Sequence, residues 1–318
     1  MNKRKSKVAI IGAGFVGAAS AYAIALKKIC SELVLIDVNA DKAIGEAADI
    51  SHGLPFIGSM DLYAGDYSCV KDCDVIVITA GANRKVGETR LDLAKKNTTI
   101  AKDITANIMK YYNGGVLLVV ANPVDILTYM IQKWTGLPSG MVIGSGTTLD
   151  TIRFRSALAS VAGIDCTNIH GYVIGEHGDS QVPVWSNTHV AGIEISDFCQ
   201  TNGIKIDDGF KNSILEQIKR GGAEVIKRKG ATYYGVAVCV ATLVDSLMRD
   251  SDTIRTVSTV LNGEFGVSDV ALSLPTIIGS SGAKKVLLPN ITDEEVALFR
   301  KSAEACKAVL EECKYLLD

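Results

Sequence analysis

Short apolar runs recur through the first half of the chain, and in several of the stretches between them the apolar residues recur at helical spacing. The runs have the length and mostly apolar character of buried parallel strands, and they occupy residues 8–11, 33–36, 62–65, 75–81, 115–120 and 142–146. Between several of them, apolar residues recur at helical spacing, which predicts helices over residues 16–28, 40–53 and 91–112. Strands that alternate with helices in this way indicate a parallel sheet covered by helices.

The hydrophobic pattern changes after residue 146. Helical stretches occur near residues 149–163, 204–229 and 233–249, whereas residues 253–274 alternate like antiparallel strands, with turns at Asn262-Gly263 and Gly266. The last helix begins with a capping box, Thr292 with Glu295. We therefore expect an α/β protein with an N-terminal parallel-sheet domain over residues 1–145 and a C-terminal α+β domain over residues 146–318.

The first predicted strand ends in a glycine-rich turn, Gly12-Ala13-Gly14-Phe15-Val16-Gly17. In such a turn the first glycine allows a tight bend, the second lets a pyrophosphate approach the backbone, and the third lets the helix pack close to the strand. The second strand ends in Asp37, whose carboxylate can bind an adenine ribose and would repel a 2′-phosphate. These features predict a Rossmann domain that binds NAD rather than NADP. A glycine turn in some other α/β protein is the alternative.

Composition narrows the classes of protein further. The chain has 318 residues and a formal charge of −2, so it is long enough for two domains and gives no reason to expect nucleic acid. No run reaches the ~18 apolar residues of a membrane span, and the basic N-terminus precedes a strand rather than a signal peptide's apolar segment. The eight cysteines show no metal-site spacing, so we expect reduced thiols, no metal and a cytoplasmic protein.

Three residues of the second half could together act on a 2-oxo acid. His177 lies in a glycine-flanked turn, and Asp150 and Arg153 lie three apart on a predicted helix. An imidazole can protonate a carbonyl near neutral pH, and a carboxylate on its other nitrogen fixes the tautomer. A guanidinium is a natural partner for a substrate carboxylate. Each residue alone is more often structural, but beside an NAD fold they predict hydride transfer to a 2-oxo acid.

Two loops follow strand ends of the predicted parallel sheet, which is where ligands of such sheets bind. Residues 82–91 form a polar loop after the strand that ends at Gly81, and they are placed where a lid over the cofactor would be. A solvated charged loop is the alternative. Asn122 follows another strand and precedes a proline that starts the next helix.

Over nearly its whole length the sequence resembles the L-lactate dehydrogenase and malate dehydrogenase superfamily. Besides the glycine turn, the motifs that carry the resemblance are Gly87-Glu88-Thr89-Arg90, Ala121-Asn122-Pro123, Gly144-Ser145-Gly146-Thr147-Thr148-Leu149-Asp150, Arg153-Phe154-Arg155 and Gly175-Glu176-His177-Gly178-Asp179. Jointly these motifs are highly specific. They imply an NAD-dependent enzyme that acts on a small 2-hydroxy acid.

The resemblance also implies a role for each site residue. His177 would donate or accept the proton, and Asp150 would orient it. Arg153 would hold the substrate carboxylate in a two-pronged pair, while Arg90 would polarise the carbonyl when the loop closes. Asn122 would help to bind the carbonyl and the nicotinamide. The cofactor-binding residues that the family implies are Gly12, Gly14, Val16, Gly17, Asp37, Gly81, Asn122, Ser145 and Val236.

The residues that select the substrate disagree with one another. Most details, including Pro183-Val184-Trp185-Ser186 and Thr232, resemble lactate enzymes, but Arg84 stands where those enzymes have Gln and malate enzymes have Arg. Arg84 would pair the distal carboxylate of oxaloacetate, and pyruvate would leave it unpaired at a cost of ~3–5 kcal/mol in a closed site. A flexible Arg could instead swing into water. We expect a lactate dehydrogenase, with malate dehydrogenase activity as the alternative and an inactive NAD-binding sensor as a remote one.

Two further positions concern regulation. Arg155 and His170 match residues that bind fructose 1,6-bisphosphate across a subunit interface in allosteric bacterial lactate dehydrogenases. Two cations that meet their symmetry copies would suit a bisphosphate and would repel each other without it. The alternative is structural, with an ion pair for Arg155 and an interface contact for His170. The resemblance also implies a homotetramer.

Overall fold

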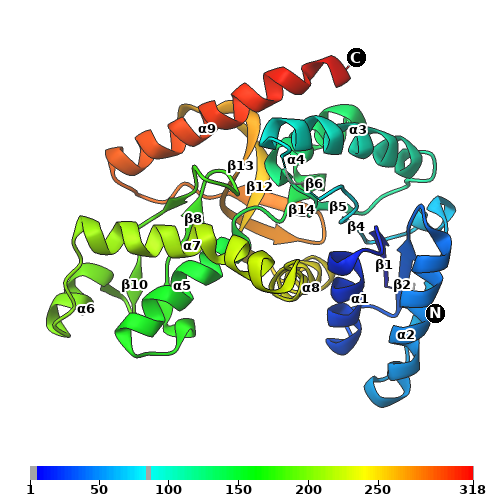
Figure 1. Cartoon of the computed structure of the whole chain (residues 1–318), viewed down its shortest axis with the longest axis horizontal. Coiled ribbons are helices and arrows are strands. Elements are labelled where there is room, and N and C mark those ends of the chain that lie inside the picture. The colour runs from blue at the N-terminus through cyan, green and yellow to red at the C-terminus, as the bar shows by residue number, and fades with distance from the viewer. Residues whose placement is uncertain (1–5, 84–86, 318) are drawn as a thin grey trace.

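The computed structural model describes residues 6–83 and 87–317, and over these residues its centre is a nine-stranded sheet (Figure 1). Six parallel strands come from the first half of the chain: β1 (Lys7–Ile11), β2 (Glu32–Ile36), β3 (Asp61–Ala64), β4 (Val75–Ile78), β5 (Val116–Val119) and β6 (Val142–Gly144). Their order in space is β3-β2-β1-β4-β5-β6. This is the strand order of a dinucleotide-binding Rossmann fold, so the predicted α/β architecture is confirmed.

Helices cover both faces of the parallel sheet because its strands are apolar on both sides. Val8 and Ile10 of β1 pack into one apolar cluster, and Ala9 and Ile11 pack into another. The first cluster includes residues of α1 (Phe15–Leu26) and α2 (Ala40–Ile57), and the second includes residues of α3 (Arg90–Met109) and α4 (Val124–Thr135). The carboxyl ends of the strands are left for the loops that carry the expected site residues.

A three-stranded antiparallel meander extends the same sheet. Its strands are β12 (Thr253–Asn262), β13 (Ser268–Gly279) and β14 (Gly282–Val286), and β12 pairs with β6 at Ser258 and Gly144. Gly144 leaves room for α4 and for β12, because a Cβ there would lie 2.5 Å from Thr128 Oγ1 and 3.0 Å from Ser258 Cβ. One sheet therefore joins the first half of the chain to the second.

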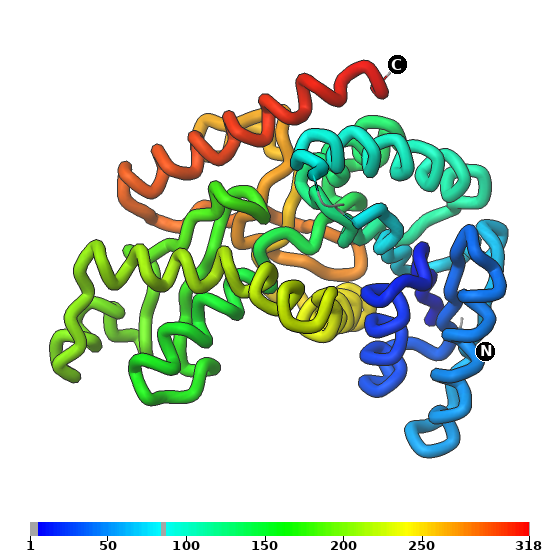
Figure 2. The backbone as a smooth tube through the Cα atoms, in the orientation of Figure 1, coloured from blue at the N-terminus to red at the C-terminus, as the bar shows by residue number. Residues whose placement is uncertain are grey.

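The remaining helices and short strands belong to the second half of the chain. The helices are α5 (Thr148–Ala162), α6 (Ile195–Thr201), α7 (Asp208–Lys229), α8 (Tyr234–Met248) and α9 (Asp293–Cys313). Short strands form two small sheets, one of β7 (Ile169–His170), β10 (His189–Val190) and β11 (Ile193–Glu194), the other of β8 (Val173–Ile174) and β9 (Val182–Pro183). Figure 2 shows α9 running back over the molecule to α3, where Lys95 Nζ lies 2.9 Å from Glu312 Oε2.

The structure confirms the capping box at the start of α9 and corrects several element boundaries. α2 continues past Gly53 to Ile57, because Leu54 is buried and holds the last turn against the body. α7 begins only at Asp208, because the side chain of Asp207 caps the helix there. Neither α6 nor β14 is predicted from the sequence, because both are short and show little apolar periodicity.

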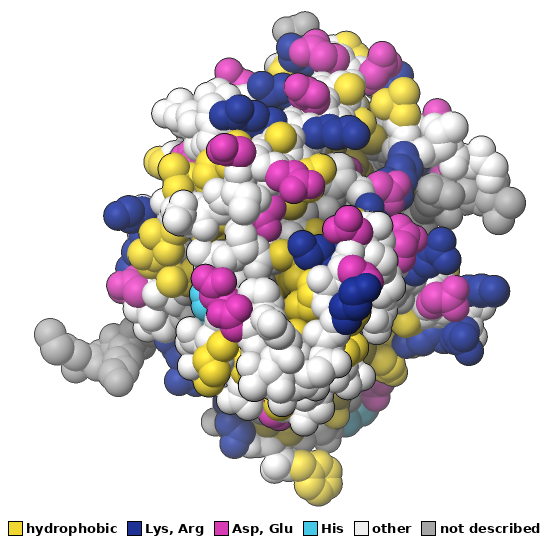
Figure 3. Space-filling view, turned by 90° about the vertical axis from the view of Figure 1, so that its left-hand side faces the viewer, with side chains coloured by type: hydrophobic (Ala, Val, Ile, Leu, Met, Phe, Trp, Pro, Cys, Tyr) yellow, Lys and Arg dark blue, Asp and Glu magenta, His cyan; other side chains and the backbone are white. Residues whose placement is uncertain are grey.

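The cysteines are mostly hidden inside the fold. All eight are free thiols, and six of them are buried. Within residues 6–83 and 87–317, no helix is long and apolar enough to cross a membrane, and no group of three or more His, Cys, Asp and Glu side chains could hold a metal ion. On the face drawn in Figure 3, acidic and basic side chains are interspersed rather than gathered by sign.

Candidate active site

The three glycines after β1 occupy positions that need glycine for different reasons. Gly12 has a φ of +106°, and a Cβ on it would lie 2.7 Å from Ala80 N. A Cβ on Gly17 would lie 1.8 Å from Gly12 O, so α1 packs directly on the turn. At Gly14, by contrast, no described residue other than its two chain neighbours has an atom within 4 Å of the position of a Cβ. The turn is therefore open where a pyrophosphate would approach.

The N-terminus of α1 is suited to bind an anion. Over this described segment, the N-cap Gly14 makes no side-chain hydrogen bond and the first turn holds no acid, so the first N–H groups of the helix face outward unpaired by a cap. Asp37 closes the turn from β2, because Oδ2 accepts the N–H of Ala13 at 2.6 Å and Oδ1 accepts that of Asn39 at 2.9 Å. Each carboxylate oxygen keeps a lone pair for a ribose hydroxyl, so these residues fit a dinucleotide.

The other residues expected at the cofactor lie around the carboxyl ends of β4 and β6. Gly81 follows β4, and Ser145 follows β6, where its backbone N–H donates to Val119 O at 2.8 Å. Val16 of α1 and Val236 of α8 pack against the same apolar cluster, although they come from different halves of the chain. Residues of both halves of the chain thus pack on one apolar cluster beside the glycine turn.

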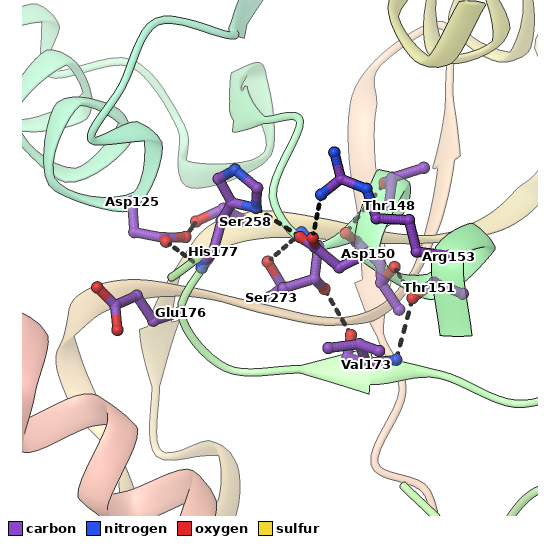
Figure 4. A network of polar contacts seen from close by, with 12 residues as sticks. Asp125, Thr148, Asp150, Thr151, Arg153, Val173, Glu176, His177, Ser258 and Ser273 are labelled. Carbon is purple, nitrogen blue, oxygen red and sulfur yellow. Dashed lines mark hydrogen bonds and ion pairs between the residues drawn. The ribbon is translucent and has the colours of Figure 1, made fainter. Parts of the chain in front are cut away.

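The structure brings His177, Asp150 and Arg153 together (Figure 4). Asp150 lies in the first turn of α5, and its Oδ2 lies 2.5 Å from His177 Nδ1. Its Oδ1 accepts a hydrogen bond from Arg153 Nη1 at 2.9 Å. The Asp150 side chain is only 2% exposed, whereas those of His177 and Arg153 are 26% and 27% exposed. The imidazole and the guanidinium therefore share one buried carboxylate, and each keeps an accessible edge.

This arrangement keeps the imidazole protonated near neutral pH. Burial by itself lowers the pKa of His177, but the charge and hydrogen bond of Asp150 outweigh burial and raise that pKa from 6.5 to about 8. Burial by itself would raise the pKa of Asp150, but His177 and Arg153 hold it below its ordinary value. A histidine with this pKa can both donate and accept a proton at physiological pH.

A second carboxylate, which no sequence motif marks, lies behind His177. Asp125 in the first turn of α4 accepts the backbone N–H of His177 at Oδ2, 2.7 Å away, and the hydroxyl of Ser258 at Oδ1, 2.6 Å away. Asp125 is 3% exposed, and burial raises its pKa to about 6, although the two hydrogen bonds act in the opposite sense. The only signal in the sequence is an acid in an otherwise apolar helix turn.

Asn97 ties the start of the loop at residues 82–91 to the loop of Asn122. Asn97 is buried on α3, and its Oδ1 accepts the N–H of Ala82 at 2.7 Å. Its Nδ2 donates to Ala82 O at 3.1 Å and to Asn122 O at 2.6 Å. Asn122 itself is exposed just beyond β5. Sequence reasoning does not find Asn97, because its role depends on contacts between separate loops.

Arg90 reaches the loop that carries His177. It is the first residue of α3, and its Nη1 lies 2.8 Å from Asp179 Oδ2. Both side chains are more than half exposed, so the ion pair is screened by water and is weak enough to exchange partners. Arg84, the residue expected to distinguish the substrates, lies outside the described residues.

The turn after α7 connects the expected substrate position to the glycine turn. A Cβ on Gly221 would lie 3.6 Å from Arg153 Nε, so α7 passes close to the guanidinium. Thr232 is half-buried between α7 and α8. The next residue, Tyr233, stacks on Phe15 of the glycine turn, with ring centroids 5.2 Å apart. The segment that carries Thr232 is thus in direct contact with the start of α1.

The two positions expected to bind an effector also lie close together. Arg155 Nε donates to Gly171 O at 3.0 Å, and Gly171 directly follows His170. His170 is exposed on β7 and pairs in register with His189 of β10. Arg155 lies 5.7 Å from the ring centre of Tyr172, and burial lowers the pKa of its guanidinium. Over residues 6–83 and 87–317, the groups that act on the pKa of Arg155 include Tyr172, Arg255 and Cys166 but no carboxylate.

Comparison with known proteins matches both halves of the chain. Residues 6–144 match the NAD binding domain of lactate/malate dehydrogenase, and residues 147–316 match the alpha/beta C-terminal domain of the same family. The L-lactate dehydrogenase of Thermoanaerobacter sp. (strain X514) is 51% identical over 307 residues, which are 96% of this chain and 99% of the relative.

Solved structures give the same result. An L-lactate dehydrogenase from Clostridium thermocellum is 60% identical, with a TM-score of 0.87 over 97% of this chain and 99% of that chain. The ligand-bound minor L-lactate dehydrogenase of Enterococcus mundtii is 39% identical, with a TM-score of 0.94 over 97% and 98% of the two chains. The sequence, the fold and both domain matches agree, and the chain belongs to the lactate/malate dehydrogenase family.

Proposed function

We propose that this chain is an L-lactate dehydrogenase, which reduces pyruvate to L-lactate with NADH and catalyses the reverse reaction with NAD. As a member of its family it is an NAD-dependent oxidoreductase of 2-hydroxy acids. The observation that carries the proposal is the contact of both His177 and Arg153 with the buried Asp150. A 2-oxo acid has a carbonyl next to a carboxylate, so it matches this acid–base group and this guanidinium.

In this proposal His177 moves the proton. Bound NADH supplies the hydride that reaches the carbonyl carbon. Nε2 of the protonated His177 donates to the carbonyl oxygen, while Asp150 accepts the hydrogen bond from Nδ1 and stabilises the charged ring. In the reverse direction the neutral imidazole accepts the hydroxyl proton of L-lactate, and Asp150 keeps the remaining proton on Nδ1.

Other groups would position the substrate and exclude water. Arg153 gives one N–H to Asp150 and keeps further donors for a two-pronged pair with the substrate carboxylate. Arg90 would leave Asp179 and polarise the carbonyl when residues 82–91 close, and Asn122 would help to bind the same carbonyl. Removing water from the site strengthens each of these interactions.

We further propose that residues 1–145 form the cofactor domain and residues 146–318 the substrate domain. The pyrophosphate would lie over Gly14 at the N-terminus of α1, and the adenine ribose would bind to Asp37. Ser145 and Val236 would flank the nicotinamide. The carboxylate of Asp37 would repel the 2′-phosphate of NADP, which makes NAD the preferred cofactor.

Arg84 favours malate dehydrogenase activity as a second candidate function. Its guanidinium would pair with the distal carboxylate of oxaloacetate, which pyruvate lacks. Thr232, by contrast, resembles the lactate enzymes and leaves less room for the larger substrate. We therefore expect oxaloacetate reduction as an additional activity of an enzyme that prefers pyruvate.

The test is kcat/KM for pyruvate and for oxaloacetate with NADH, measured for the natural chain, Arg84→Gln and Lys85→Gln. Arg84→Gln should lower kcat/KM for oxaloacetate by about tenfold or more, because losing ~1.4 kcal/mol of the ion pair with the distal carboxylate is enough for a tenfold change. Lys85→Gln removes a neighbouring charge and should leave kcat/KM unchanged for both substrates. A preference for oxaloacetate that Arg84→Gln abolishes would make the chain a malate dehydrogenase. A flat trace with both substrates would favour an inactive NAD-binding sensor.

We also propose a homotetramer that binds fructose 1,6-bisphosphate at Arg155 and His170. Exposed apolar side chains on α2 and α8, such as Phe56 (94% exposed) and Tyr234 (67% exposed), support association with other copies. In the same assays, fructose 1,6-bisphosphate should raise kcat/KM for pyruvate in the natural chain but not in Arg155→Gln. Sedimentation should show a tetramer. An unchanged rate in the natural chain would leave Arg155 and His170 with structural roles.

A further inference from the structure

Asp125 is a buried carboxylate that the proposed reaction does not use directly. We propose that it is a positioning residue: it holds the backbone of His177, joins this loop to the loop of Asn122, and places a second negative charge near the imidazole. The inference rests on the proposed function, in which His177 donates the proton and Asn122 contacts the same carbonyl.

Both oxygens of Asp125 are committed to groups that fix the histidine loop. Oδ2 accepts the backbone N–H of His177, and Oδ1 accepts the hydroxyl of Ser258 on β12 (Figure 4). An ionised carboxylate with 3% exposure is costly to bury, and two hydrogen bonds offset only part of that cost. A neutral Asn could make both contacts, because its amide carries an acceptor for the N–H and a donor for the hydroxyl oxygen. The charge of Asp125 is therefore the property that a neutral residue with the same two hydrogen bonds would lack.

Asp125 also links two loops that would contact one atom of the substrate. Asn122 lies just before α4, and Asp125 lies in the first turn of that helix, where the positive end of the helix favours a negative charge. The bond from His177 to Asp125 thus fixes α4, and Asn122 with it, relative to the histidine. Two groups that must meet one carbonyl oxygen gain from such fixed geometry, because small displacements cost rate.

The charges around the imidazole come from several elements. The ionisable groups near His177 or Asp125 are Asp150 and Arg153 on α5, Glu176 on the histidine loop and Cys306 on α9. The charge of Asp125 raises the pKa of His177 in the same sense as that of Asp150. Because burial brings the pKa of Asp125 itself to about 6, its charge is present at neutral pH and is lost as the pH falls through 6.

The matched variants are Asp125→Asn, which can keep both hydrogen bonds but loses the charge, and Ser258→Ala, which loses one hydrogen bond but keeps the charge. Pyruvate reduction needs protonated His177, so kcat/KM with NADH falls as the pH rises through the pKa of that histidine. Asp125→Asn should move the midpoint of this fall to lower pH by roughly one unit, because the charge of Asp125 raises the pKa of His177. Ser258→Ala should leave the midpoint in place. An unchanged midpoint in Asp125→Asn overturns the proposal.

A measurement on the natural chain keeps the proposal testable if Asp125→Asn does not fold. The chain has four histidines, so the ring signal of His177 in an NMR titration can be assigned by its loss in His177→Gln. That signal should show its own titration and a second inflection near pH 6 as Asp125 takes up a proton. A single inflection overturns the proposal. Because the titration needs no turnover, a chain without pyruvate activity would refute the proposed function and still give this result.

Discussion

At the scale of single residues, Asp150 serves two partners with one carboxylate. Its two oxygens contact His177 and Arg153, which would act on neighbouring groups of the same substrate. A buried carboxylate is tolerated only when its oxygens are paired, so the ion pairs that hold Asp150 also fix the spacing of the two cations. The proposed acid–base group and the proposed carboxylate-binding group are therefore linked through Asp150.

The raised pKa of His177 gives a pH dependence of known sign. Because its folded pKa of about 8 exceeds the ordinary 6.5, the histidine adds stability below pH 6.5 that is lost as the pH rises through 8. As the pH rises through 8, kcat/KM for pyruvate reduction should fall and kcat/KM for lactate oxidation should increase. Without the charge of Asp150, burial dominates, so Asp150→Asn should lower the midpoint and cost roughly 10²–10⁴-fold in pyruvate reduction at pH 7.

The measurement is a pH profile of kcat/KM in both directions. Asp165→Asn is the matched control, because Asp165 is an exposed acid on the turn after α5 and its carboxylate, among the described residues, accepts hydrogen bonds from Thr167 alone. It should reproduce the natural profile. An Asp150→Asn enzyme with the natural midpoint would contradict the role given to this carboxylate.

The residues proposed to contact a ligand could be predicted from short motifs, but the residues that hold them in place could not. His177, Asp150 and Arg153 are marked by local sequence, and the structure places them in contact. Asp125 and Ser258 lie 133 residues apart, inside segments whose apolar pattern indicates only a core helix and a core strand. Such contacts depend on which elements pack together, so no local pattern reveals them.

At the scale of elements, the interior of the sheet is more predictable than its edge. The parallel strands are apolar on both faces, and this is visible as continuous runs such as Val75–Ile78 (β4). The edge strand β14 carries exposed lysines and resembles a loop in its sequence. The antiparallel pairing of β12 with β6 is also invisible in the sequence, because it depends on the close approach of Ser258 to Gly144.

The packing of α1 against α8 brings two aromatic rings together. Phe15 and Tyr233 stack with an interplanar angle of 21°, and Lys229 Nζ lies 3.6 Å from the ring centre of Tyr233. A double-mutant cycle of Phe15→Ala and Tyr233→Ala should give a coupling of about 0.5–1.5 kcal/mol in the free energy of unfolding by urea. The value should lie near the lower end, because Phe15 is 66% exposed.

A second cycle controls for general damage to α1. Tyr22 lies on the same helix and is 50% exposed, so Tyr22→Ala combined with Tyr233→Ala should be additive. Additive effects of Phe15→Ala and Tyr233→Ala would mean that the stack does not link the glycine turn to the segment of Thr232.

At the scale of the whole molecule, one sheet carries both proposed domains. The proposed boundary after residue 145 lies next to β6, the strand that pairs with the antiparallel meander at Ser258. The side chain of Ser258, on strand β12 of the meander, bonds to Asp125, which in turn bonds to the His177 backbone. The histidine loop is therefore fixed to the sheet that carries the glycine turn. In the proposed reaction, the proton donor and the bound cofactor would thus be held in fixed positions relative to each other.

The buried cysteines make the folded chain resistant to thiol chemistry. Burial raises the pKa of Cys30, Cys73 and Cys239 to about 12, and only the thiolate form reacts readily. A colorimetric disulfide reagent should therefore modify at most Cys69 and Cys166, the two half-buried thiols, in the native protein and all eight thiols in denaturant. Rapid modification of more than two native thiols would contradict this. If the six buried thiols are instead labelled slowly, the rate of their labelling reports how often the core opens, and this measurement needs no substrate or cofactor.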